Sequence, residues 1–127
     1  MSESLWVIPD VSTVKTPLSI LREQANQLTQ QTGGLLRGDV AARPWNGSFS
    51  LSLRIIVPAL ENYMVELLTY DQPLKLYPGS MDSDFYDDVV SWKVENEDRF
   101  VSALRAVLSS RKTREVLSAL LAQARAN

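Results

Sequence analysis

The sequence predicts an α+β fold: an N-terminal helix, then an antiparallel sheet of three to five strands, then two C-terminal helices packed on one face of the sheet. Three observations lead to this prediction. Ser48 to Val57 alternates apolar and polar residues as a half-buried strand does. Other strand-like runs lie on both sides of it, and helical spacing of apolar residues is confined to the two ends of the chain. Because a chain of 127 residues buries about one core, a single domain spanning 1–127 is expected.

The central stretch from Ser48 to Val57 has clear boundaries. Asn46-Gly47 precedes it, and both residue types adopt the positive φ angles that a two-residue hairpin turn requires. Pro58 follows it, and proline lacks the N–H group that pairing in a sheet needs. We therefore expect this strand to lie in the middle of the sheet, with the helices covering its apolar side.

The first fifteen residues are predicted to form an extended arm laid on the core. Leu5-Trp6-Val7-Ile8 is too short an apolar run for a helix of its own, and Pro9 ends it. A tryptophan near a terminus is usually buried, which favours packing on the core. The alternative is an exposed segment that docks on a partner or on a second subunit.

A helix is expected from about Pro17 to Thr32. Thr16 can cap its first N–H groups, proline suits the first helical position, and Gly33-Gly34 ends the run. The polar face of this helix carries three glutamines at helical spacing, Gln24, Gln27 and Gln31. A solvated face explains this stripe, and a surface that reads nucleic-acid bases or binds a partner helix is the alternative.

Weaker strand signals flank the central strand. Residues 35–42 alternate in the same way and predict an antiparallel hairpin with it. Residues 58–72 fit either a helix or a short turn followed by a strand, and we favour the strand because a two-stranded hairpin is marginal by itself. A brief strand is expected at 74–77, closed by Pro78-Gly79. The apolar residues Val89, Val90, Trp92 and Val94 indicate a further buried strand or short helix.

Two tandem helices are expected at the C-terminal end. Asn96 can cap the first, whose apolar stripe runs to Leu108. Continuing that stripe would place charged residues in the core, so the helix should stop near Ser109-Ser110. Ser110 can then cap a last helix with its own stripe.

Composition excludes several classes of chemistry. The chain contains neither Cys nor His, so disulfides, thiol nucleophiles, Cys/His zinc sites and imidazole proton transfer are excluded. A net charge of −2 gives no global basic field for nucleic acid, and no run of 18 apolar residues indicates a membrane span. We expect a cytoplasmic protein that needs no cofactor and no membrane.

The charge of the C-terminal half is polarised. Residues 81–98 hold seven carboxylates against Lys93, whereas residues 99–127 hold six basic residues against Glu115. Clustered carboxylates suit Ca²⁺ or Mg²⁺, but an EF-hand starting at Asp82 fails because its sixth position is Asp87 and its twelfth is Lys93. We therefore predict no metal site. The tract is interpreted as a binding surface for a basic partner, through Asp82, Asp84, Asp87 and Asp88.

Trp45 is the remaining candidate for partner binding. It lies in the turn-rich connector 43–47, where an aromatic side chain can anchor a partner. Folding of the indole back over the hairpin is the expectation, and exposure at the loop tip is the alternative.

Two segments carry a resemblance. TPLSILREQANQLTQQTGGLL, residues 16–36, and FVSALRAVLSSRKTR, residues 100–114, resemble segments of small uncharacterised bacterial proteins. The resemblance covers less than half of the chain and implies a bacterial, intracellular protein without an assigned activity.

The function predicted from these observations is non-catalytic protein binding. A neutralising protein of the immunity or antitoxin type, with an acidic tract that meets a basic partner, is the preferred hypothesis. One alternative is a carboxylate- or metal-dependent hydrolase. The other is a homodimeric scaffold assembled through edge strands or through the N-terminal arm.

Overall fold

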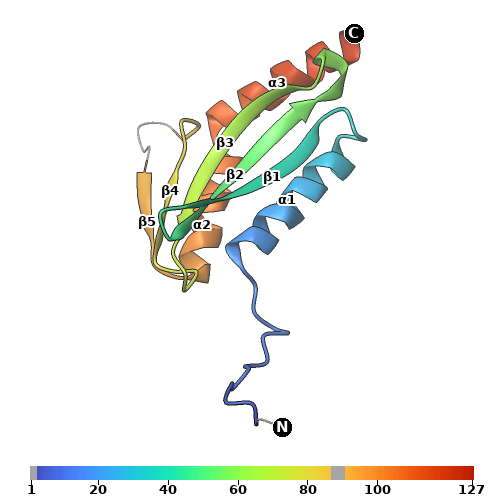
Figure 1. The fold of residues 1–127 in the computed structure, drawn as a ribbon. Helices are drawn as coiled ribbons and strands as arrows, with labels where there is room; N and C mark the ends of the chain where they lie inside the picture. Colours follow the sequence, from blue (N-terminus) through green and yellow to red (C-terminus); the bar gives the residue numbers. More distant parts are fainter. Residues whose placement is uncertain (1–2, 87–90) are drawn as a thin grey trace.

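A computed structural model of the chain describes residues 3–86 and 91–127 (Figure 1). Within these residues a helix precedes an antiparallel sheet of five strands in the order β1-β2-β3-β4-β5, and two helices follow it. The predicted α+β fold is therefore confirmed. The bounds are α1 Pro17–Gln31, β1 Arg37–Trp45, β2 Ser48–Val57, β3 Tyr63–Gln72, β4 Gly79–Asp82, β5 Ser91–Val94, α2 Glu97–Leu108 and α3 Arg111–Ala126, with a 3-10 turn at Pro58–Leu60.

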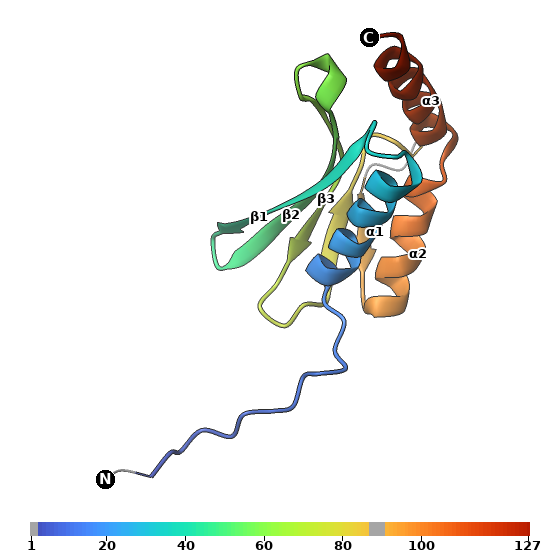
Figure 2. The same ribbon diagram turned by 90° about the vertical axis from the view of Figure 1, so that its right-hand side faces the viewer.

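All three helices lie on one side of the sheet (Figure 2). Strand β2 shows this clearly, because Leu51, Leu53, Ile55 and Val57 are buried towards the helices. The alternate residues of β2 face the other side and are only half-buried. The two-residue period of this strand thus divides the sheet into a face covered by helices and a face that they leave uncovered.

The central strand has the predicted bounds and lies second in the sheet order. At the β1–β2 turn, Asn46 and Gly47 have φ angles of 42° and 77°, which is the left-handed conformation expected of a tight hairpin. The strand interpretation of residues 58–72 is confirmed, since Pro58–Leu60 forms a 3-10 turn and β3 begins at Tyr63. Strand β1 continues to Trp45, three residues beyond the predicted end.

The strand expected at residues 74–77 is wrong. The chain turns there, with the N–H of Leu76 donating to the carbonyl of Pro73 and a φ angle of 76° at Leu76. The fourth strand is instead Gly79–Asp82, which pairs with β3 on one side and β5 on the other. Of the residues predicted to form a buried element at 89–94, Val89 and Val90 lie outside the described residues, while β5 spans Ser91–Val94.

Each helix begins where its predicted cap lies. The hydroxyl of Thr16 accepts from the N–H of Ser19, and the Asn96 side chain accepts from the N–H of Arg99. The Ser110 hydroxyl accepts from the N–H of Thr113 and starts α3. Local capping chemistry therefore sets the three helix starts.

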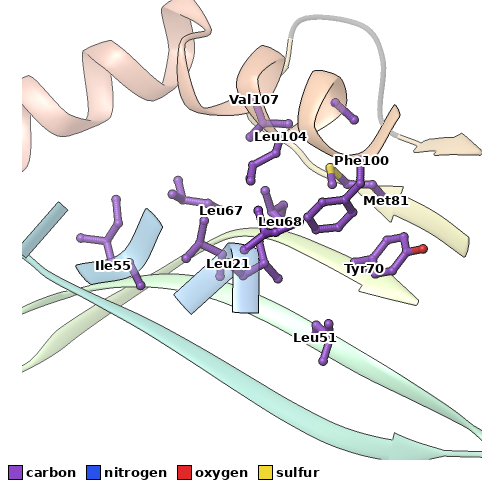
Figure 3. Packing of buried hydrophobic residues seen from close by; sticks show 14 of the residues in the cluster. Leu21, Leu51, Ile55, Leu67, Leu68, Tyr70, Met81, Phe100, Leu104 and Val107 are labelled. Atoms are coloured by element: carbon purple, nitrogen blue, oxygen red, sulfur yellow. The ribbon is translucent and has the colours of Figure 1, made fainter. Parts of the chain in front are cut away.

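The core is centred between β3 and α2. Tyr70 and Phe100 are fully buried and meet edge to face, with ring centroids 4.9 Å apart (Figure 3). Leu21 of α1 and Leu68 of β3 are buried in the same cluster. The helices are thus joined to the sheet by one continuous apolar cluster.

The N-terminal arm is extended, but it is not laid on the core. It leads away from the body of the molecule (Figures 1 and 2), and Leu5, Trp6, Val7 and Ile8 are 92%, 81%, 90% and 77% exposed. The predicted packing of the tryptophan on the core is therefore wrong. A turn precedes α1, where the N–H of Val14 donates to the carbonyl of Val11, and the apolar run lies beyond this turn.

No helix of the described residues is both long and apolar enough to cross a membrane.

Candidate functional site: the uncovered face of the sheet

Small polar side chains line the uncovered face of the sheet. The strand register places Ser50 between Arg43 and Asp71, and Ser80 between Asp71 and Lys93. The next row across the strands contains Ala41, Ser52, Thr69, Asp82 and Ser91. Short side chains therefore occupy the middle of this face, and charged side chains lie beside them in the same rows.

The charges on this face are divided between its two halves. Strand β1 and strand β2 contribute Arg37, Arg43, Arg54 and Asp39. Arg54 is held by Asp39, because its Nε donates to Oδ2 of that carboxylate at 2.8 Å. The charged residues that β3 and β4 place on this face are all carboxylates, namely Glu66, Asp71 and Asp82, and β5 adds Lys93.

A hollow of about 520 Å³ lies where β4 ends beside β3. Its carboxylates are Glu66, Asp82 and Asp84, and we call it the acidic hollow. The Ser83 hydroxyl donates to the carbonyl of Leu67 at 2.7 Å and accepts from the N–H of Phe85 at 3.0 Å. Because Ser83 is buried and fixed in this way, the residues on either side of it are held beside β3.

The carboxylates of the acidic hollow are not neutralised within the described residues. The ion pairs there join Asp39 to Arg54, Lys93 to Glu95 and Arg111 to Glu115. Glu66 lies directly opposite Arg54 in the register, but the arginine is bound to Asp39 instead. The hollow therefore presents negative charge that a basic group from outside could meet.

A second hollow, of about 380 Å³, lies at the hairpin end of the same face. Trp45 lines it together with Arg43, Ser48, Ser50 and Asp71, and we call it the tryptophan hollow. The indole is 65% exposed, so the expectation that it folds back over the hairpin is wrong. Trp45 is the last residue of β1 and pairs with Ser48, and the serines around it are too small to cover the ring.

The structure thus brings together part of the predicted site. Asp82 and Asp84 meet at the acidic hollow, and Trp45 lies on the same face at the hairpin end. Asp87 and Asp88 lie outside the described residues. Glu66 was not predicted from the sequence, although its alternation with Val65 and Leu67 places it on the uncovered face once residues 63–72 are taken as a strand.

The carboxylates of the acidic hollow do not converge as the ligands of a metal ion do. In residues 3–86 and 91–127, no group of three or more acidic side chains is close enough to hold a metal ion. The three carboxylates are instead spread around a space far larger than a cation. Such an arrangement can hold basic side chains and backbone amides of a polypeptide.

In comparisons with known proteins, no family model, curated sequence or solved structure matches this chain.

Proposed function

We propose that this protein is a non-catalytic protein-binding module that holds a basic segment of its partner on the uncovered face of its sheet. The observation that carries the proposal is the acidic hollow, where Glu66, Asp82 and Asp84 have no basic residue paired with them in the described part of the chain. A neutralising protein of the immunity or antitoxin type would use such a surface. Its charge would speed the encounter with a basic partner and set the orientation of the complex.

The second hollow supports a polypeptide as the ligand. Trp45 offers a large, exposed apolar ring on the same face, and tryptophan is enriched among the residues that dominate binding energy at interfaces. A partner that spans both hollows would place an apolar group against the indole and basic groups against the carboxylates. Arg43, which is near Trp45, would disfavour the reverse orientation.

The first experiment is a binding titration with a defined probe. A fluorescent peptide rich in Arg and Lys is titrated with the protein, and an acidic peptide of the same length serves as the reference. We expect the affinity for the basic peptide to fall at least about tenfold between ~50 mM and ~300 mM salt, because exposed charges are screened. Affinity that is independent of salt would contradict the proposal.

The second experiment locates the site with matched charge changes. The variant Glu66→Gln/Asp82→Asn/Asp84→Asn removes the three carboxylates of the acidic hollow. The control Glu3→Gln/Glu23→Gln/Glu115→Gln removes three exposed carboxylates elsewhere and changes the net charge equally. We expect binding to be lost in the first variant and kept in the control, and an equal loss in both would assign the effect to net charge alone.

A metal-dependent hydrolase, the rival hypothesis, requires carboxylates that converge on an ion. Its test is thermal unfolding with and without Mg²⁺ or Ca²⁺. A rise in melting temperature that Asp84→Asn abolishes would favour the hydrolase over the binding module.

A further inference from the structure

A groove runs along α1 on the helical side of the molecule. It consists of two adjoining hollows, of about 160 Å³ and about 400 Å³, which share Gln24 and Leu108. The residues of α1 from Ile20 to Gln31 form one wall, a length of about 17 Å at the helical rise, and Lys15 lies at its end just before the helix. Helix α2 and the start of α3 form the other wall.

The smaller of the two hollows has an apolar floor and a rim of amide side chains. Leu53, Ile55 and Leu67 of the sheet form the floor, and half-buried leucines stand on both walls. The glutamine stripe that the sequence singles out, Gln24, Gln27 and Gln31, forms the rim along α1. We call the whole feature the α1 groove.

The same chain carries an apolar segment without packing partners. Leu5-Trp6-Val7-Ile8 is extended and exposed, and its side chains alternate so that both sides of the segment are apolar. Two hydrogen bonds set the direction of the arm at its base. The N–H of Ser12 donates to Oδ1 of Asp10, and the N–H of Val14 donates to the carbonyl of Val11.

We propose that the arm of one copy of this protein lies in the α1 groove of a second copy, and that the exchange is reciprocal. The four apolar residues span about 13 Å when extended, so they fit within the wall that α1 provides. Trp6 would enter between the walls, where the indole N–H can donate to a glutamine amide oxygen at the rim. A buried tryptophan needs such a partner for its N–H group.

A second copy is the occupant because the arm leads away from its own body. The turn at 10–14 directs residues 3–9 outwards, as both views of the fold show (Figures 1 and 2). Reciprocal exchange also gives two identical contacts related by a two-fold axis, which is the commonest symmetry of homodimers. Each arm would bury on the order of 500 Å², so two arms and two grooves together reach the size of a stable interface.

Disulfide cross-linking between engineered cysteines tests whether the arm of one copy lies in the α1 groove of the other. The chain has no cysteine, so a single one can be placed on each of two differently tagged copies. Val7→Cys on one copy and Gln27→Cys on the other should form a mixed disulfide under mild oxidation. Val7→Cys with Ser52→Cys, on the uncovered face of the sheet, is the control and should not cross-link. Equal cross-linking of both pairs would overturn the proposal.

Sedimentation tests the assembly itself. We expect the full chain to be a dimer at ~50 µM, and we expect Trp6→Ser and the removal of residues 2–14 each to weaken dimerisation at least about a hundredfold. These changes affect exposed residues and should leave the fold intact. Trp45→Ser, which alters an exposed tryptophan outside the arm, should leave the dimer unchanged. A monomeric full chain, or a dimer that persists without the arm, would overturn the proposal.

Discussion

The backbone of Gly38 in β1 lies directly against the backbone of Ala25 in α1. A Cβ atom at position 38 would overlap the carbonyl oxygen and the Cα atom of Ala25. A hydroxyl group strengthens this contact, since the N–H of Gly38 donates to Oγ1 of Thr29 at 3.0 Å and that hydroxyl donates to the carbonyl of Ala25 at 3.2 Å. Glycine at position 38 therefore sets how closely α1 approaches the sheet.

Gly38→Ala should destabilise the protein. The new methyl group cannot be accommodated by a side-chain rotation because both partners are backbone, so α1 must move away from β1. We expect a loss of about 2–3 kcal/mol in the free energy of unfolding, measured by urea titration. Ala41→Val is the control, because it adds methyl groups to the same strand on the uncovered face and should change stability by less than ~0.5 kcal/mol.

Thr113→Val should also destabilise the protein, through the junction of α2 and α3. Thr113 is buried, and its Oγ1 donates to the carbonyl of Val107 at 2.7 Å. Valine keeps the shape but leaves that carbonyl without this donor, so we expect a loss of about 1–3 kcal/mol. Thermal unfolding measures the effect. Ser109→Ala removes an exposed hydroxyl from the same junction and should cost less than half as much; an equal cost would contradict the importance of burial.

Local signals were enough to predict much of the fold. The alternation at Ser48–Val57, its turn at Asn46-Gly47 and the caps at Thr16, Asn96 and Ser110 each depend on residues close in sequence. These elements appear at or near their predicted bounds. Patterns within about ten residues therefore determine the starts and types of most elements here.

Long-range contacts explain what the sequence did not predict. Gly79 was interpreted as the end of a strand, but it begins β4. Its backbone lies so close to β3 that a side chain there would overlap the Tyr70 ring and the carbonyl of Asp71, a contact that no local pattern reveals. The acidic hollow likewise forms only when β4 pairs with β3, so Glu66 could not be joined to Asp82 and Asp84 from spacing alone. General burial tendencies also failed for Trp6 and Trp45, which are both exposed.

Trp45→Ser should weaken partner binding without changing the stability of the fold. The indole is mostly exposed on the uncovered face, so its removal should change the free energy of unfolding by less than ~0.5 kcal/mol. If the partner spans both hollows, the same change should weaken binding at least about tenfold, as the loss of an aromatic anchor does. Calorimetric titration with the isolated partner measures this. Leu74→Ser alters an even more exposed apolar residue outside the face and should leave the affinity unchanged.

The buried Tyr70 and the half-buried Tyr77 predict how stability depends on alkaline pH. Burial, with a smaller contribution from Glu97, raises the pKa of Tyr77 to about 12, and burial also raises the pKa of Tyr70 above its ordinary value. Unfolded tyrosine titrates near pH ~10. The folded protein therefore keeps its phenol protons where the unfolded chain loses them. The stability due to these groups is complete below pH ~10 and falls as the pH rises towards the folded pKa values.

Tyr77→Phe and Tyr70→Phe should differ in their effect at neutral pH. The hydroxyl of Tyr77 is buried without a hydrogen-bond partner in the described part of the chain, so its removal should leave stability unchanged or raise it by up to ~1 kcal/mol. The hydroxyl of Tyr70 donates to the carbonyl of Leu76 at 2.8 Å, so its removal should cost about 1 kcal/mol. Urea titrations from pH ~7 to ~11 should also show a weaker loss of stability above pH ~10 in each variant than in the parent chain. An unchanged alkaline slope in both variants would mean that other groups control the alkaline transition.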